Sequence, residues 1–275
     1  MIISITTDFG NKDGYVGTMK GVMAGIAPGV PTIDITHIIS PQNVQETAYV
    51  LWTALPYFPA DAVHLVVVDP GVGTPRRAIA AHSAMGYFVG PDNGVFTYVW
   101  TVAPPDKIVS LTNPEFQLVD MSSTFHGRDI FSPAAAYLAA GIDLDSFGPE
   151  VENPVMLPHP FMAVNSGVIS GTILYIDHFG NCITSIGRLA WRADVLNLHP
   201  VWDNGQELAF TAGHTSVTAA GLNLGPIRHT YGEVGLGEGL ALVGSEGLLE
   251  IATNHGSGAR DLGLSTGDPV TVAFT

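Results

Sequence analysis

The chain has 275 residues, and 25 acidic side chains against 10 lysines and arginines give it a net charge of −15. That length is comfortable for two domains, and 46% hydrophobic residues can bury a sizeable core, which excludes a disordered chain. So negative a chain repels nucleic acids, whereas it tolerates a small cationic ligand. The acidity can equally serve solubility alone.

Cys182 is the one cysteine, so neither an internal disulfide nor a thiolate metal site can form within one chain. The first residues lack the basic segment and long apolar core of a signal peptide. No apolar run approaches the roughly 20 residues of a membrane span. We therefore expect a soluble, cytoplasmic protein without a membrane or nucleic-acid partner.

Strand-like and helix-like segments alternate in the first half of the chain. The predicted strands are residues 2–6, 32–35, 64–68 and 87–89, and the predicted helices are residues 16–27, 46–55 and 134–140. The apolar run 64–68 is typical of a strand buried on both faces. Ser132 as cap, Pro133 at the first helical position and Gly141 after the last turn bound the third helix. The alternation favours an α/β domain with a mainly parallel sheet.

Strand-forming residues dominate beyond about residue 160. The strand-rich segments are residues 167–186, 201–211, 240–251 and 269–274. Turn-type sequences at residues 203–205 and 245–247 predict hairpins, and no long amphipathic helix is evident. We expect an N-terminal α/β domain over residues 1–160 and a smaller all-β domain, a barrel or a sandwich, over residues 161–275.

Several predicted strands end in a polar residue that precedes a glycine-containing turn. Ligands of open parallel sheets bind beyond the carboxyl ends of the strands. The residues expected on this rim are Asp8, Asp69, Arg76 and Asn93. We interpret Asn93 as an ordinary turn residue. Asp69 and Arg76 flank a two-glycine turn, a pattern that fits either an ionised, directed carboxylate in a site or a structural ion pair.

Two further segments carry candidate site residues. His126 before Gly127 at the mouth of a helix can face a pocket, although a lone histidine is more often structural; Arg128 and Asp129 are expected to anchor the loop. Residues 177–181 fit either a binding edge or the polar tip of a hairpin. Dinucleotide, phosphate-loop, metal-ligand and serine-nucleophile motifs are missing, so we expect no cofactor and no metal.

These motifs together resemble the S-adenosylmethionine (SAM) hydroxide adenosyltransferase family, relatives of enzymes that fluorinate or chlorinate the same substrate. The matching stretches are residues 6–10, 13–17, 34–37, 69–77, 90–94, 123–129, 177–181 and 245–251. The resemblance implies an N-terminal α/β domain and a C-terminal β domain. It also implies a homotrimer with the substrate between the N-terminal domain of one subunit and the C-terminal domain of a neighbour.

The resemblance also implies roles for individual residues. Asp69, Arg76 and His126 match the catalytic set of the hydrolytic branch, which the halogenating relatives lack. The implied substrate-binding residues are Asp8 for the ribose hydroxyls, Tyr15, Asp177 for the methionine amino group, Phe179, Asn181 for adenine and Ser245 for the methionine carboxylate. Two positions depart from the halogenating branch: Glu246 stands in place of an arginine and Gln42 in place of a tryptophan.

The implied reaction is attack of water on C5′ of SAM, which gives adenosine and L-methionine. Because the sulfonium departs as a neutral thioether, the site needs a positioned nucleophile and no general acid. We hypothesise that Arg76 and His126 orient the water. Its proton goes to Asp69, alone or through His126, and His126 remains an alternative base because Arg76 lowers the basicity of Asp69. The alternatives are a halogenase, a non-catalytic SAM-binding protein and a nucleoside hydrolase that uses Asp8.

Overall fold

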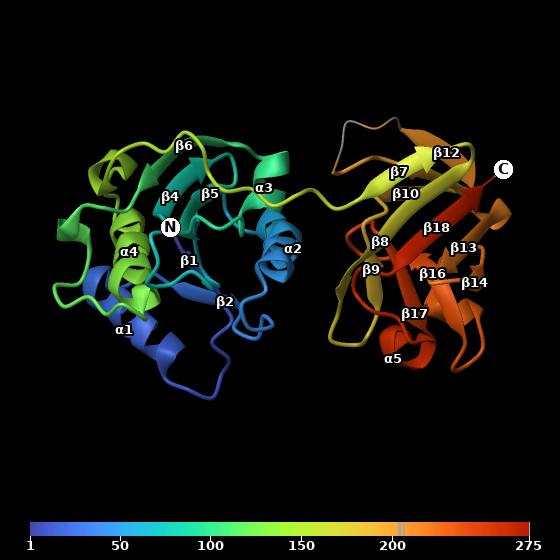
Figure 1. Cartoon of the computed structure of the whole chain (residues 1–275), viewed down its shortest axis with the longest axis horizontal. Helices are drawn as coiled ribbons and strands as arrows, with labels where there is room; N and C mark the ends of the chain where they lie inside the picture. The colour runs from blue at the N-terminus through green and yellow to red at the C-terminus, as the bar shows by residue number, and fades with distance from the viewer. Residues whose placement is uncertain (203–204, 206, 275) are drawn as a thin grey trace. The chain divides into compact units, whose positions relative to one another are not determined.

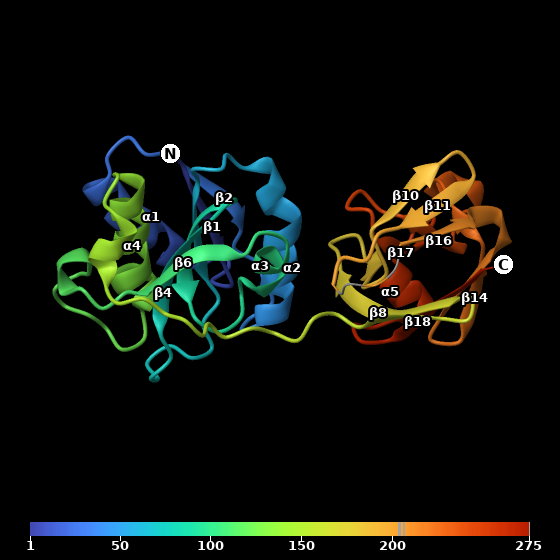
Figure 2. The same ribbon diagram turned by 90° about the horizontal axis from the view of Figure 1, so that it is seen from above.

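The computed structural model describes residues 1–202, 205 and 207–274. The chain divides into two compact units, Met1–Leu157 and Pro158–Thr275. Figure 1 and Figure 2 show the elements of each unit from two directions. Each unit has its own hydrophobic core, and they are described in turn.

The N-terminal unit is built on a six-stranded sheet in the order β2-β1-β3-β5-β4-β6. The strands are β1 (Ile3–Thr7), β2 (Thr32–Thr36), β3 (Val63–Val67), β4 (Ala78–Ser83), β5 (Gly86–Pro91) and β6 (Pro105–Ser110). Strand β1 pairs with β2 and β3 in parallel, as β3 does with β5, whereas β4 runs antiparallel to both β5 and β6. The predicted α/β architecture with a mainly parallel sheet is confirmed.

Helices cover both faces of this sheet (Figure 1). Helices α1 (Tyr15–Ile26) and α4 (Ser132–Ala139) lie side by side on one face, and α2 (Val44–Ala54) and α3 (Thr97–Val102) lie on the other. Met19 of α1 and Ala135 of α4 are fully buried in one cluster with Leu65 of β3. Strand β3 is buried along its whole length, which explains its continuous apolar sequence.

The start of α4 differs from the prediction. Ser132 does not cap the helix, because a wide helical turn over Gly127–Phe131 leads into α4 without a break. The Ser132 hydroxyl instead donates a 2.7 Å hydrogen bond back to the carbonyl of Gly127. The residues before Ser132 are thus already helical, and the segment that begins at Gly127 follows His126 directly.

The C-terminal unit is a mostly antiparallel, nearly barrel-like β structure, which confirms the predicted β domain. Its strands are β7 (Met162–Asn165), β8 (Val168–Ile176), β9 (Cys182–Thr184), β10 (Leu189–Arg192), β11 (Val195–Leu198), β12 (Leu208–Thr211), β13 (Thr215–Ala219), β14 (Leu222–Gly225), β15 (Ile227–Arg228), β16 (Gly239–Val243), β17 (Leu249–Thr253) and β18 (Pro269–Phe274). A short helix, α5 (Gly258–Leu262), was not predicted.

The two predicted hairpin turns of this unit have different outcomes. Strands β16 and β17 pair antiparallel around residues 245–247, as the sequence predicts. The turn predicted at residues 203–205 includes Asp203 and Asn204, which lie outside the described residues. In the described part of the chain, no helix is long and apolar enough to cross a membrane.

Candidate active site

The loop between β3 and β4 brings Asp69 and Arg76 together. Gly73 in this loop has φ +77°, a left-handed conformation that favours glycine, and the Thr74 hydroxyl donates to the Gly71 carbonyl at 2.6 Å. The Arg76 Nε then lies 3.0 Å from both carboxylate oxygens of Asp69, and its Nη2 donates to Oδ2. The side chains are 10% and 6% exposed, so the loop fixes a buried, forked ion pair.

His126 joins this pair from a distant part of the chain. Its Nδ1 lies 2.8 Å from Nη2 of Arg76. The guanidinium also lies over the Phe131 ring, 5.2 Å from its centroid, in the helical turn that follows His126. The structure therefore brings Asp69, Arg76 and His126 into one hydrogen-bonded chain at the carboxyl end of β3.

The contact with Arg76 fixes which nitrogen of His126 carries a proton. A guanidinium only donates hydrogen bonds, so Nδ1 must accept and the neutral ring carries its proton on Nε2. Burial and then the charge of Arg76 hold the pKa of His126 below its usual range, against the opposing charges of Asp69 and Asp129. A neutral His126 therefore offers an N–H donor, while Asp69 keeps lone pairs for a further donor.

This arrangement gives a prediction for the titration of His126. We expect the neutral ring to be the Nε2–H tautomer and its midpoint to lie below 6.5, because protonation would break the bond from Arg76 and place two cations together. Side-chain ¹⁵N chemical shifts, assigned by comparison with His126→Gln, report both quantities. An Nδ1–H tautomer, or a midpoint at or above 6.5, would contradict the geometry.

Asp8 and Tyr15 come from the loop after β1 and the start of α1. The Asp8 carboxylate accepts a 2.8 Å hydrogen bond from the backbone N–H of Gln42 at Oδ2, which directs the side chain. The half-exposed Tyr15 ring packs against Phe9 and Phe125, with centroid distances of 5.7 and 5.3 Å. Phe125 immediately precedes His126, so these aromatic rings adjoin the loop that carries the imidazole.

Asn93 and Asp129 have structural roles, as expected from the sequence. The Asn93 side-chain amide donates to the Val68 carbonyl at 3.0 Å and ties the turn after β5 to the end of β3. Asp129 is fully buried, pairs with Arg128 and accepts from the backbone N–H of Ser122 at 2.8 Å. Asp129 therefore anchors the loop that precedes His126.

The other candidate residues lie in the C-terminal unit around a cavity of about 450 Å³. Asp177, Phe179, Asn181 and Ser245 all line it. The Asp177 carboxylate accepts from the backbone N–H groups of Phe179 and Asn181 at 2.9 and 2.8 Å, and from the Asn181 amide at 2.9 Å. The Asp177–Asn181 segment is therefore a hydrogen-bonded turn that also forms part of the cavity wall. It fits both the hairpin-tip and the binding-edge interpretation of its sequence.

Glu250 and Tyr231 are among the residues of this cavity that sequence reasoning missed. Both line it, and the Tyr231 hydroxyl donates to Glu250 Oε1 at 2.6 Å. Burial raises the pKa of Glu250, and the nearby charge of Asp177 adds to this effect. The available signal was a carboxylate within the otherwise uncharged strand β17, because an acidic residue in a buried strand needs a partner.

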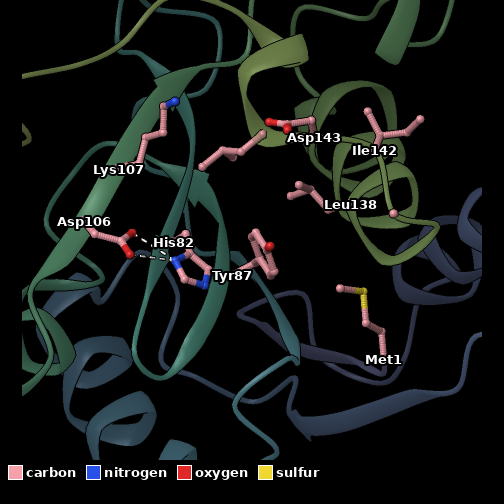
Figure 3. A pocket seen from close by; sticks show the side chains of 10 residues that line it. Met1, His82, Tyr87, Asp106, Lys107, Leu138, Ile142 and Asp143 are labelled. Atoms are coloured by element: carbon pink, nitrogen blue, oxygen red, sulfur yellow. Dashed lines mark hydrogen bonds and ion pairs between the residues drawn. The ribbon is translucent and has the colours of Figure 1, made fainter.

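A further cavity, of about 640 Å³, lies at the opposite edge of the N-terminal sheet (Figure 3). Met1, before β1, and Tyr87, at the start of β5, line it, so it is at the amino ends of the parallel strands. Its basic groups are already paired: His82 lies 2.9 Å from Asp106, and Lys107 pairs with Asp145. None of the predicted site residues lines it. The described residues contain no group of three or more histidine, cysteine or acidic side chains able to hold a metal ion.

Comparison with known proteins identifies the family. The model of the SAM hydroxide adenosyltransferase N-terminal domain matches residues 3–148, and that of the C-terminal domain matches residues 171–271. The chain belongs to the SAM hydroxide adenosyltransferase family. An (R)-S-adenosyl-L-methionine hydrolase from Thermus thermophilus is 41% identical over 96% of each chain. A fluorinase from an Actinoplanes species is 27% identical over 98% of this chain and 97% of its own.

A solved structure of a similar protein supports the fold of both units of the chain. The crystal structure of an uncharacterized conserved protein from Thermotoga maritima is 34% identical and matches with a TM-score of 0.86. The match covers 99% of this chain and 100% of the other. Both units are therefore shared with a protein of known structure.

Proposed function

We propose that the chain is a SAM hydrolase, in which water attacks C5′ of SAM to give adenosine and L-methionine. The observation that carries this proposal is the hydrogen-bonded chain of Asp69, Arg76 and His126. The relatives named (R)-S-adenosyl-L-methionine hydrolase, about 40% identical over nearly the whole chain, support it. The fluorinases, at 27–28% identity, are more distant.

The tautomer of His126 determines the roles of the three side chains: His126 orients the water, Asp69 accepts its proton, and Arg76 positions both. A water oxygen accepts a hydrogen bond from Nε2–H of His126, which leaves its lone pair to face C5′ and its proton to face Asp69. Asp69 then accepts that proton as the C5′–O bond forms and the C5′–S bond breaks. Arg76 holds the carboxylate and the imidazole in fixed directions through its two contacts.

Burial of the site favours the reaction. The electron pair of the broken C5′–S bond stays on sulfur, so the sulfonium charge disappears and methionine leaves with a neutral thioether. A water that delivers its proton to an anion while it attacks a cation cancels charge in the transition state. A poorly hydrated pocket therefore disfavours the separated charges more than the transition state. The near-complete burial of Asp69 and Arg76 supports this part of the proposal.

The remaining roles concern the substrate and assembly. We propose that Asp8 holds the ribose hydroxyls, with Tyr15 beside it, and that Phe179, Asn181 and Ser245 bind the adenine and methionine parts. Asp8 and the residues of the 450 Å³ cavity belong to different units, and the family resemblance supports a homotrimer in which two subunits complete one site. Sedimentation equilibrium should give three times the 28.9 kDa chain mass. The single, buried cysteine supports a reducing cytoplasmic location.

Incubation of the purified chain with SAM in H₂¹⁸O tests the function. We expect adenosine with label in its 5′-hydroxyl and unlabelled methionine. Adenosine without label would overturn attack of water at C5′. Each alternative has its own product: 5′-halo-5′-deoxyadenosine that depends on added halide identifies a halogenase, free adenine a nucleoside hydrolase, and intact SAM a non-catalytic binding protein.

A further inference from the structure

Glu250 is a buried carboxyl group that none of the roles above uses. It is 7% exposed, lies on β17 and faces the 450 Å³ cavity together with Asp177 and Ser245. The Tyr231 hydroxyl donates to its Oε1 at 2.6 Å. Among the described residues, no group donates a hydrogen bond to its Oε2. Oε2 is not among the enclosed side-chain oxygens that lack a partner, so it is open to the cavity, where a ligand can donate a hydrogen bond to it.

The opposite strand of the hairpin leaves room for this oxygen. Gly244 follows β16 directly, and a Cβ atom at that position would lie 2.8 Å from Glu250 Oε2. Any larger residue there would therefore displace the carboxylate. Because Gly244 has no side chain, Oε2 of Glu250 has room beside it at the cavity wall. The hydrogen bond from Tyr231 to Oε1 fixes the direction of the carboxylate.

The charges around the cavity favour a cationic ligand. The described residues that line it include two carboxylates and neither lysine nor arginine. Asp177 accepts hydrogen bonds from its own turn at both oxygens, whereas Oε2 of Glu250 accepts none from the described residues. Burial and the charge of Asp177 raise the pKa of Glu250. A cation beside the two carboxylates stabilises their ionised forms and so opposes this rise in pKa.

The proposed substrate has two cationic centres, and their chemistry differs. The sulfonium has no N–H group and must lie in line with the attacking water. The α-ammonium group of the methionine part has three N–H donors, which suit an open carboxylate oxygen. We infer that Glu250 is a specificity-determining residue whose Oε2 accepts a hydrogen bond from the α-ammonium group, with Tyr231 fixing the direction of the carboxylate.

This inference rests on the proposed SAM hydrolysis and adds one residue to it. The family resemblance places Asp177 near the amino group, and its oxygens also hold the Asp177–Asn181 turn. Glu250 adds a second carboxylate to the same cavity, with an oxygen that accepts no hydrogen bond from the described residues. The site therefore selects an α-amino acid over the corresponding chain without the amino group.

The test compares two substrates in the full-length protein: SAM and its analogue in which hydrogen replaces the α-amino group. Adenosine release gives kcat/KM for each. A hydrogen bond to a charged group corresponds to a preference of about 10–100-fold for SAM in the wild type. Glu250→Gln should reduce that preference, mainly through KM for SAM, and leave the analogue unaffected. Glu238→Gln, an exposed site in the same unit, is the matched control and should keep the preference.

Tyr231→Phe gives a second readout if Glu250→Gln folds poorly. It keeps the carboxylate, removes its orienting bond and should reduce the preference while retaining the turnover of the analogue. Undiminished preference in both variants would overturn the inference, while SAM hydrolysis itself would stand. If the wild type leaves SAM intact, the hydrolase proposal fails separately. The same comparison is then made with calorimetric dissociation constants, where equal preference in wild type and Glu250→Gln overturns the role of Glu250.

Discussion

Asp69→Asn should lower kcat for SAM hydrolysis by about 10²–10⁴-fold, the usual loss when a positioned base is removed. The amide has nearly the same shape as the carboxylate, but it cannot take the proton of the attacking water at neutral pH. The KM for SAM should change little, because Asp69 contacts the nucleophile in the proposed mechanism. Initial rates of adenosine release across a range of SAM concentrations separate the two constants.

Asp106→Asn is the matched control for this variant. It makes the same chemical change in another aspartate paired with a basic side chain, His82, at the cavity on the opposite edge of the sheet. We expect Asp106→Asn to keep the wild-type kcat. If Asp69→Asn also keeps it while His126→Gln loses activity, the proton acceptor is His126 and the tautomer argument is wrong. Thermal unfolding of each variant shows whether the charge left on Arg76 destabilises the fold.

Gly73→Ala should reduce kcat by about 100-fold, the scale expected when a reacting group moves by about 1 Å. A Cβ atom at Gly73 would lie 2.7 Å from the carbonyl oxygen of Ser123, so one of the two loops must move. One loop carries Asp69 and Arg76, and the other leads to His126. Arg76 and His126 contact each other across these two loops. The substitution should therefore separate the two side chains without removing a polar group from the site.

Gly29→Ala distinguishes displacement of the loops from backbone strain. Gly29 also has a left-handed conformation, with φ +91°, but a Cβ atom at this position would have no neighbour within 4 Å. Both variants carry the strain of a left-handed alanine, roughly 1–2 kcal/mol, and should lower the free energy of unfolding accordingly. Only Gly73→Ala should lose activity. Equal activity of the two variants would show that the Gly73 contact does not position the site.

Much of the fold was predictable because its strongest signals are local. The apolar run of β3 and the strand-forming residues of β18 predict the first and last residues of these strands to within one residue. The alanine-rich strand β4 and the six-residue helix α3 carry weak local patterns, and neither was predicted. Strand β4 is positioned by its pairing with β5 and β6, and α3 by its packing against α2, and a local pattern contains neither of these contacts.

The same distinction holds for the candidate site. Asp69 and Arg76 are seven residues apart, and the glycines between them indicate a turn that brings them together. His126 lies 50 residues beyond Arg76. No local pattern connects His126 with Asp69 and Arg76, so its place beside them was predicted from the family resemblance alone. The one acidic residue of β17 indicates that Glu250 has a partner, but the local pattern shows neither that this partner is Tyr231, 19 residues earlier, nor that the carboxyl group lines a cavity.

The reversed direction of β4 within the sheet has a consequence for the evolution of this family. Because β4 runs against its neighbours, it starts at the edge where β3 ends, and a short loop suffices to join them. In the proposed mechanism, substitutions or insertions in that loop change the groups that face the attacking water without shifting any strand register. On this proposal, homologues can differ in the attacking species and keep the same sheet.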